Sequence, residues 1–348
     1  MSTPILELKD CEVHFPVYGG ILRHKVATVK AVDGVSLDIH EGETLGLVGE
    51  SGSGKTTVGR AVINLLRATS PDVHLGGQIL YRTREGRQID LNGLSRREMR
   101  PLRAEIQMVF QDPFSSLNPR MTVEQIVSGP IKLHMDLDRN ARRNRVHELL
   151  EKVGLQSSYA SRYPHEFSGG QRQRIGLARA LSTNPRIVIA DEPVSALDVS
   201  VQAQVVNLME DLQDEFGLTY LFIAHDIGIV YHVSDRIAVM YLGNVVEFGT
   251  AEEVFRTSKH PYTRALLSAV PEPDPDGKRP DRIVLEGDIP TPLAKPSGCG
   301  FRTRCPIARP ECAAARPNFE TFSDSHFAAC PYTETLNEKG TPHVEPRV

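Results

Sequence analysis

The stretch that decides the fold reads Gly49-Glu50-Ser51-Gly52-Ser53-Gly54-Lys55-Thr56-Thr57. It fits the pattern G-x-x-x-x-G-K-[ST], between an apolar run at 44–48 that is typical of a buried strand and a segment at 58–66 with helical apolar spacing. Because glycines carry no Cβ atom, successive backbone N–H groups can converge on phosphates at the positive end of a helix. Lys55 can then reach the β- and γ-phosphates, and the Thr56 hydroxyl can hold Mg²⁺. The stretch therefore predicts a nucleoside triphosphate site.

Length and composition limit the class of protein. The 348 residues suffice for one large domain with an extension, or for two domains. The 40 basic and 44 acidic residues give a net charge of −4, which argues against a nucleic-acid partner because such surfaces usually carry a basic excess. No apolar run approaches the roughly 18 to 20 residues needed to cross a bilayer, and the first residues lack the features of a secretory signal. We therefore expect a protein that is made and kept in the cytosol.

The segment before the phosphate loop has the alternation of strands. Residues 5–48 predict a small antiparallel sheet that leads into the nucleotide-binding strand. Phe15 or Tyr18 is expected in its first loop, where an aromatic ring could stack on a purine. A packing role explains either ring equally well.

Between the phosphate loop and residue 154 the pattern changes from strand to helix. A strand at 106–110 is expected to end at Gln111-Asp112-Pro113, because proline cannot donate to a ladder. The helical period then runs from 122 to 154.

A second glycine-rich stretch opens another helix, and it reads Phe167-Ser168-Gly169-Gly170-Gln171. Ser168 can serve as the N-cap, and the two glycines leave the helix terminus bare, which makes a second possible anion site. A cap alone would account for Ser168 but would not require the two glycines.

Two apolar runs end in side chains that can do chemistry. Asp191 and Glu192 follow the run 187–190, and His225 follows the run 220–224. Such runs are typical of central parallel strands, whose carboxyl ends share one edge of the sheet. There Asp191 could act on Mg²⁺, Glu192 could orient or deprotonate a water molecule, and His225 could contact the γ-phosphate. Two acids after a strand can also simply cap the next helix, and a lone histidine is usually structural.

The order of these motifs strongly resembles that of the ATPase subunits of ABC transporters, over nearly the whole chain. The resemblance implies an α/β P-loop NTPase with an antiparallel β subdomain, a helical signature subdomain at about 112–170 and a C-terminal cysteine-rich extension. The nucleotide-binding domain would span 1–258, and the extension would span 259–348.

The resemblance also implies roles that spacing alone does not supply. Phe15 would stack on adenine, Gln111 would sense Mg²⁺ and water, and Asp198 would cross to a partner subunit. The signature residues would bind the ATP held by that partner, so each ATP site would be composite; they are Ser168, Gly169, Gly170 and Gln171. Phe167 replaces the Leu that commonly begins this signature, but it keeps the apolar character.

The segment at 259–271 and the cysteine-bearing tail resemble the oligopeptide/dipeptide uptake group, whose two ATPases are usually different chains called D and F. The run at 111–120 looks closer to the F-type chain. This resemblance implies a D-type ATPase partner, two transmembrane permease subunits and an extracytoplasmic substrate-binding protein, with our chain at the cytoplasmic face of the membrane. The group also carries nickel, glutathione and oligosaccharides, so the cargo stays open. A soluble ABC ATPase that does not transport is a further alternative.

Four cysteines lie beyond a Pro- and Asp-rich linker at 271–278, and they are Cys299, Cys305, Cys312 and Cys330. Their spacing, C-x5-C-x6-C-x17-C, contains no C-x-x-C pair. It suits an iron–sulfur cluster better than a zinc ribbon, with free thiols as the third possibility. The resemblance favours a [4Fe–4S] cluster, which related importers carry in this extension.

Overall fold

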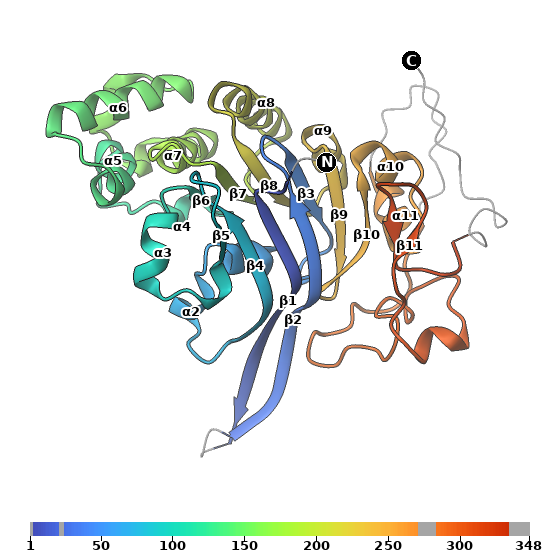
Figure 1. Ribbon diagram of the computed structural model, residues 1–348. Coiled ribbons are helices and arrows are strands. Elements are labelled where there is room, and N and C mark those ends of the chain that lie inside the picture. Colours follow the sequence, from blue (N-terminus) through green and yellow to red (C-terminus); the bar gives the residue numbers. More distant parts are fainter. Residues whose placement is uncertain (1–2, 21–23, 271–282, 334–348) are drawn as a thin grey trace, which may run out of the picture.

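The computed structural model describes residues 3–20, 24–270 and 283–333, in two sheets surrounded by helices (Figure 1). The larger sheet has the strand order β11-β12-β10-β9-β3-β8-β7-β6. Its strands are β3 (Thr44–Val48), β6 (Ile106–Val109), β7 (Ile187–Asp191), β8 (Thr219–Ala224), β9 (Arg236–Tyr241), β10 (Asn244–Thr250), β11 (Glu320–Thr321) and β12 (Phe327–Ala328). The strands from β9 to β6 are parallel, whereas β10, β12 and β11 continue the sheet with antiparallel pairing.

The smaller sheet is antiparallel, with the order β2-β1-β4-β5, and its strands are β1 (Leu6–Gly19), β2 (His24–Ile39), β4 (His74–Arg82) and β5 (Gln88–Asp90). The α/β architecture with an antiparallel subdomain that the resemblance implies is confirmed. The position of Phe15 and Tyr18 is a correction, because β1 runs on to Gly19 and places both rings inside a long strand, opposite Val29 and Lys25 of β2, rather than in a loop.

Helices pack against both faces of the larger sheet. They are α1 (Lys55–Val62), α2 (Leu66–Thr69), α3 (Arg96–Leu102), α4 (Pro113–Ser116), α5 (Val123–His134), α6 (Arg139–Lys152), α7 (Gly169–Leu181), α8 (Val199–Phe216), α9 (Ile227–Val233), α10 (Ala251–Arg256) and α11 (Pro261–Leu267). The group α5, α6 and α7 lies toward the β6 edge, and the tail lies at the opposite edge beside α10 and α11 (Figure 1). Among the residues described, no helix is both long and apolar enough to span a bilayer.

The apolar strands pack on both of their faces. Along β7, Val188 and Ala190 join the core cluster that includes α5 to α8, whereas Ile187 and Ile189 join the cluster under the antiparallel sheet. Because successive side chains of a strand point to opposite faces, a central strand between two cores must be apolar throughout. This double burial fixes the carboxyl ends of β3, β8, β7 and β6 at one edge.

The first helix is shorter than its apolar pattern predicts. It ends at Val62, because Asn64 has a left-handed φ of 51° and its side-chain amide donates to the carbonyls of Leu91 and Leu94 at 3.1 and 2.9 Å. Leu66 then begins the short helix α2. The linker predicted at 271–278 lies outside the described residues.

Candidate functional site

The phosphate loop joins β3, which lies between β9 and β8, to the N-terminus of α1. Gly54 caps this helix with a φ of 107°, and a Cβ atom there would lie 2.2 Å from the carbonyl oxygen of Ala31. Both the left-handed backbone and the close approach require glycine. The loop therefore keeps its backbone N–H groups at the helix terminus, where they can bind an anion.

Lys55 is almost fully buried, with 4% of its surface exposed. Its Nζ atom donates to the carbonyl oxygens of Gly49 and Glu50 at 2.6 and 2.9 Å. Burial lowers the pKa of the ammonium group, although Glu192 and Asp191 oppose the shift. The loop thus surrounds a desolvated cation that a phosphate group can neutralise.

Thr56 and Asp191 form a pair of oxygen ligands. The Thr56 hydroxyl donates to Oδ1 of Asp191 at 2.7 Å, and Asp191 is 1% exposed at the end of β7. Burial raises the pKa of Asp191, and the Thr56 hydrogen bond opposes this. Such oxygen donors beside a phosphate loop suit Mg²⁺, which binds through one or two protein oxygens together with phosphates and water. The donor set therefore fits the predicted metal.

The side chains of Gln111 and His225, which lie far from Glu192 in the sequence, both contact the Glu192 carboxylate. Oε2 of Glu192 accepts a hydrogen bond from Nε2 of Gln111 at 2.7 Å and lies 3.5 Å from Nδ1 of His225. They follow β7, β6 and β8 respectively, at the same edge of the sheet. Glu192 has a φ of 46° and its N–H donates to the carbonyl of Ile223 at 2.8 Å, so the backbone is held in a sparsely populated conformation there. This arrangement can hold and polarise a water molecule next to the phosphate loop.

The second glycine-rich stretch caps its own helix. The Ser168 N–H donates to Oε1 of Gln171 at 3.1 Å, and the Gln171 N–H donates to Oγ of Ser168 at 3.3 Å. Ser168 is exposed, as is Asp198, whose side chain makes no cap bond to α8 although it occupies the N-cap position. Both side chains are available to a ligand or a partner. Phe167 is buried and packs edge-on against Tyr159, so its apolar character is used in the core.

The two aromatic candidates for purine stacking differ in their surroundings. Phe15 is partly buried and packs against the core cluster under the antiparallel sheet. Tyr18 is 43% exposed, and its hydroxyl donates to Asp72 at 3.3 Å. The stacking role of Phe15 stays a prediction.

The four tail cysteines line one cavity. Its walls also include Phe301 and Ile307. The Cys299 N–H donates to the carbonyl oxygen of Cys312 at 2.8 Å, which joins two of the contributing loops. Burial raises the pKa of Cys305 to about 12 and that of Cys330 to about 11. These thiols are therefore desolvated side chains facing a common space.

The sulfur atoms do not form a compact group in the part of the chain that the structure describes. No set of three described ligand atoms that includes a cysteine has all its members within 4.8 Å of one another. The Cys312 sulfur accepts a hydrogen bond from the Arg309 N–H of its own loop at 3.5 Å, and nearby backbone N–H groups oppose the rise in the pKa of Cys299, Cys305 and Cys330. Each sulfur thus has its own local surroundings.

Residues that the motifs did not reveal connect this tail to the phosphate loop. Arg304 donates to both carboxylate oxygens of Glu50 at 2.7 and 3.2 Å, and the Glu50 N–H donates to the hydroxyl of Tyr262 at 2.7 Å. The Arg304 side chain is only 8% exposed. Tyr262 is fully buried, with Tyr241 and Phe301 against its ring. The only hint in the sequence is that Arg304 and Tyr262 fall inside the two segments typical of the oligopeptide group.

Comparison with known proteins agrees with this geometry. Residues 32–195 match the family model "ABC transporter", and residues 246–312 match "Oligopeptide/dipeptide transporter, C-terminal region". The chain is 53% identical over 328 residues to the oligopeptide transport ATP-binding protein AppF of Bacillus subtilis, covering 94% of our chain and 96% of the relative. It belongs to the ABC-transporter ATP-binding proteins of the oligopeptide group.

Other members of this ABC family give the same picture. The oligopeptide transport ATP-binding protein OppF of Salmonella typhimurium is 53% identical over 330 residues, covering 94% of our chain and 95% of the relative. Among solved structures, cbiO1 of Clostridium perfringens has a TM-score of 0.59 at 29% identity, over 73% of this ABC ATPase and 91% of that chain. A dimeric post-hydrolysis structure of the cassette MJ0796 with ADP and Pi has a TM-score of 0.58 at 30% identity. The match covers 71% of our chain and 98% of that chain.

Proposed function

We infer that this chain is the ATP-hydrolysing subunit of an ABC importer that takes up peptides across the cytoplasmic membrane. The observation that carries the inference is the meeting of Gln111, Glu192 and His225 beside the Thr56–Asp191 pair and the buried Lys55. The relatives support the cargo, since AppF and OppF are named oligopeptide transport ATP-binding proteins, and the resemblance of the tail to the uptake group supports import.

In this proposal each residue of the site has one task. The phosphate loop and Lys55 bind the phosphates, while Thr56 and Asp191 hold Mg²⁺, which would neutralise phosphate charge when bound. Glu192 accepts the proton of the attacking water, and Gln111 fixes its carboxylate. His225 reaches the γ-phosphate. Phe15 stacks on the adenine.

The site is completed by a second ATPase subunit. Ser168, Gly170 and the exposed Asp198 act across the interface on ATP held by the opposite subunit. The dimeric structure of the related cassette MJ0796 with ADP and Pi supports the pairing of two ATPase subunits. Closing on ATP and opening after hydrolysis then form the working cycle.

The remaining subunits of the complex follow from the same group. We propose a D-type ATPase as the partner, two transmembrane permease subunits and an extracytoplasmic substrate-binding protein. Our chain would lie at the cytoplasmic face of the membrane as a peripheral subunit, and its proposed helical subdomain at about 112–170 would transmit the motion. The boundary between nucleotide-binding domain and extension is proposed near residue 258, before α11.

Peptide uptake by the purified complex tests the function. Vesicles that contain the complex are loaded so that ATP and Mg²⁺ face this subunit, and a labelled oligopeptide with its binding protein is added on the other side. We expect ATP-dependent accumulation of the peptide. If nickel, glutathione or an oligosaccharide accumulates in place of the peptide, the chain serves an importer of the same group with a different cargo. ATP hydrolysis with no transported solute would contradict import.

For the tail we propose a [4Fe–4S] cluster bound by Cys299, Cys305, Cys312 and Cys330. All four line one cavity, and the Arg309 N–H donates to the Cys312 sulfur at 3.5 Å. The spacing of the four cysteines, which contains no C-x-x-C pair, supports a cluster over zinc. Metal ligation would contribute folding energy to a tail with little core of its own.

Anaerobic purification provides the test of the cluster. We expect a brown protein with a broad absorption near the blue edge of the visible spectrum and with iron and sulfide in equal amounts. Cys305→Ser should lose the colour, whereas the control Cys11→Ser should keep it, because Cys11 is buried in the separate core under the antiparallel sheet. A colourless protein with stoichiometric zinc would show that the proposal is wrong.

A further inference from the structure

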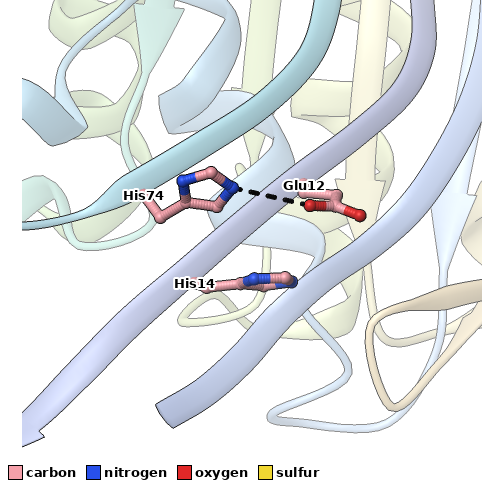
Figure 2. A group of neighbouring side chains, drawn as sticks. All are labelled: Glu12, His14 and His74. Atoms are coloured by element: carbon pink, nitrogen blue, oxygen red, sulfur yellow. Dashed lines mark ion pairs between the residues drawn. The ribbon is translucent and has the colours of Figure 1, made fainter.

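Three side chains with metal-binding atoms gather on the outer face of the antiparallel sheet (Figure 2). His14 of β1 is the direct cross-strand partner of His74 of β4, and Glu12 precedes His14 by two residues. Val13 between them is fully buried, so Glu12 and His14 belong to the face away from the core. The group is therefore a product of strand register rather than of loop conformation.

The distances within this group are short. Nε2 of His74 lies 3.6 Å from Oε2 of Glu12, and the rings of His14 and His74 have centroids 5.5 Å apart. One ligand atom from each of the three residues lies within 4.8 Å of the other two. Over residues 3–20, 24–270 and 283–333, no other set of three His, Cys, Asp or Glu side chains meets this criterion.

His14 is already oriented by an acid. Its Nε2 lies 3.3 Å from Oδ1 of Asp33 on β2, and Asp33 is itself held by Lys295 and Lys30, whose Nζ atoms lie 3.3 and 3.5 Å from it. A histidine that engages a carboxylate through one ring nitrogen offers the other nitrogen to a metal ion, with the ring orientation fixed. The side chain of His14 is only 13% exposed, which further limits the orientations that its ring can adopt.

A glycine keeps the other two ligands together. Gly76 lies opposite Glu12 in the β1–β4 register. A Cβ atom at Gly76 would be 2.9 Å from Oε2 of Glu12 and 3.3 Å from Nε2 of His74. Any side chain at this position would therefore displace the Glu12 carboxylate from the His74 imidazole.

We propose that Glu12, His14 and His74 form a binding site for a transition-metal dication of the Zn²⁺ class. Two imidazoles and one carboxylate suit such ions, whereas Mg²⁺ and Ca²⁺ prefer oxygen ligands throughout. Three protein ligands leave a coordination position for water, which the exposure of the His74 side chain, 63%, permits. The bound ion would link β1 to β4 beside Phe15, the next residue along β1.

Cobalt titration of the full-length protein without nucleotide tests this site. Co²⁺ on nitrogen and oxygen ligands gives d–d absorption bands without the thiolate-to-metal charge-transfer band that cysteine ligands add, so the tail cysteines are distinguished by their spectrum. We expect the wild-type protein to bind one Co²⁺ with the first kind of spectrum. His74→Ala should weaken that binding by at least about tenfold, because it removes a direct ligand.

The matched control is His24→Ala, since His24 is an exposed histidine on β2 of the same sheet. It should bind Co²⁺ like the wild type. Asp33→Asn should keep the site but weaken it by about tenfold, as expected for an orienting carboxylate. An unchanged Co²⁺ affinity and spectrum in His74→Ala would overturn the proposal, and so would bound Co²⁺ that always shows the thiolate band. Neither result would affect the proposed ATPase function, because none of the three ligands belongs to the ATP site.

Discussion

Replacing Glu192 by Gln is expected to lower ATP turnover by about 10² to 10⁴-fold, which is the usual contribution of a positioned general base. The glutamine amide keeps the size of the side chain and can still meet Gln111 and His225, but it cannot accept the proton of the attacking water. Lys55 and the Thr56–Asp191 pair are untouched, so binding of ATP and Mg²⁺ should persist. The variant should therefore accumulate as an ATP-bound closed dimer.

Steady-state hydrolysis together with size-exclusion chromatography in ATP–Mg²⁺ checks this expectation. A suitable control is Glu210→Gln, because Glu210 lies on α8 away from the carboxyl edge of the sheet and should hydrolyse ATP like the wild type. Turnover at the wild-type rate in Glu192→Gln would show that the role given to Glu192 is wrong.

Replacing Arg304 by Leu should lower the free energy of unfolding by about 3 kcal/mol, because it leaves the Glu50 carboxylate without its buried partner. The same change should weaken ATP binding, since Glu50 is the second residue of the phosphate loop and is held from two sides by Arg304 and Tyr262. Denaturant unfolding and equilibrium ATP binding measure the two effects. This is the largest stability effect that we expect outside the apolar cores.

A double-mutant cycle separates the ion pair from general damage to the tail. Glu50→Gln in the Arg304→Leu background should recover part of the lost stability, because it removes the uncompensated charge. Arg302→Leu is the matched control on the same loop, since the Arg302 guanidinium donates to the carbonyl and hydroxyl oxygens of Ser297 rather than to Glu50, and it should cost less than about 1 kcal/mol. Wild-type stability and ATP affinity in Arg304→Leu would contradict a structural link between the tail and the phosphate loop.

Much of the fold follows from local patterns. The all-apolar runs before Gly49, Asp191 and His225 indicate central parallel strands, and the structure has β3, β7 and β8 there. The carboxyl-edge rule then brings Glu192 near His225 without any knowledge of distances. The family resemblance was needed to predict a role for Gln111 at this site, because a glutamine after a strand does not by itself indicate any chemistry.

The features that the sequence could not predict depend on long-range pairing. Glu50 and Arg304 are separated by 254 positions, and the sequence around either residue does not predict that the other is its partner. The grouping of Glu12 with His74 requires the β1–β4 register, which the antiparallel pattern alone did not fix. Asn64 ended the first helix through tertiary hydrogen bonds to Leu91 and Leu94, which overrode the apolar period that continues through Leu66. In each case the deciding partner lies on another element.

A structure of the Glu192→Gln importer complex with ATP and Mg²⁺ would show whether two subunits share each ATP. We expect one γ-phosphate to lie between Lys55 of our chain and the signature helix of its partner, and Ser168 and Gly170 of our chain to contact the ATP bound by that partner. If ATP fills the phosphate loops while the signature helices of the opposite subunits do not contact it, the composite site is contradicted. The transport cycle that depends on this site would then be wrong as well.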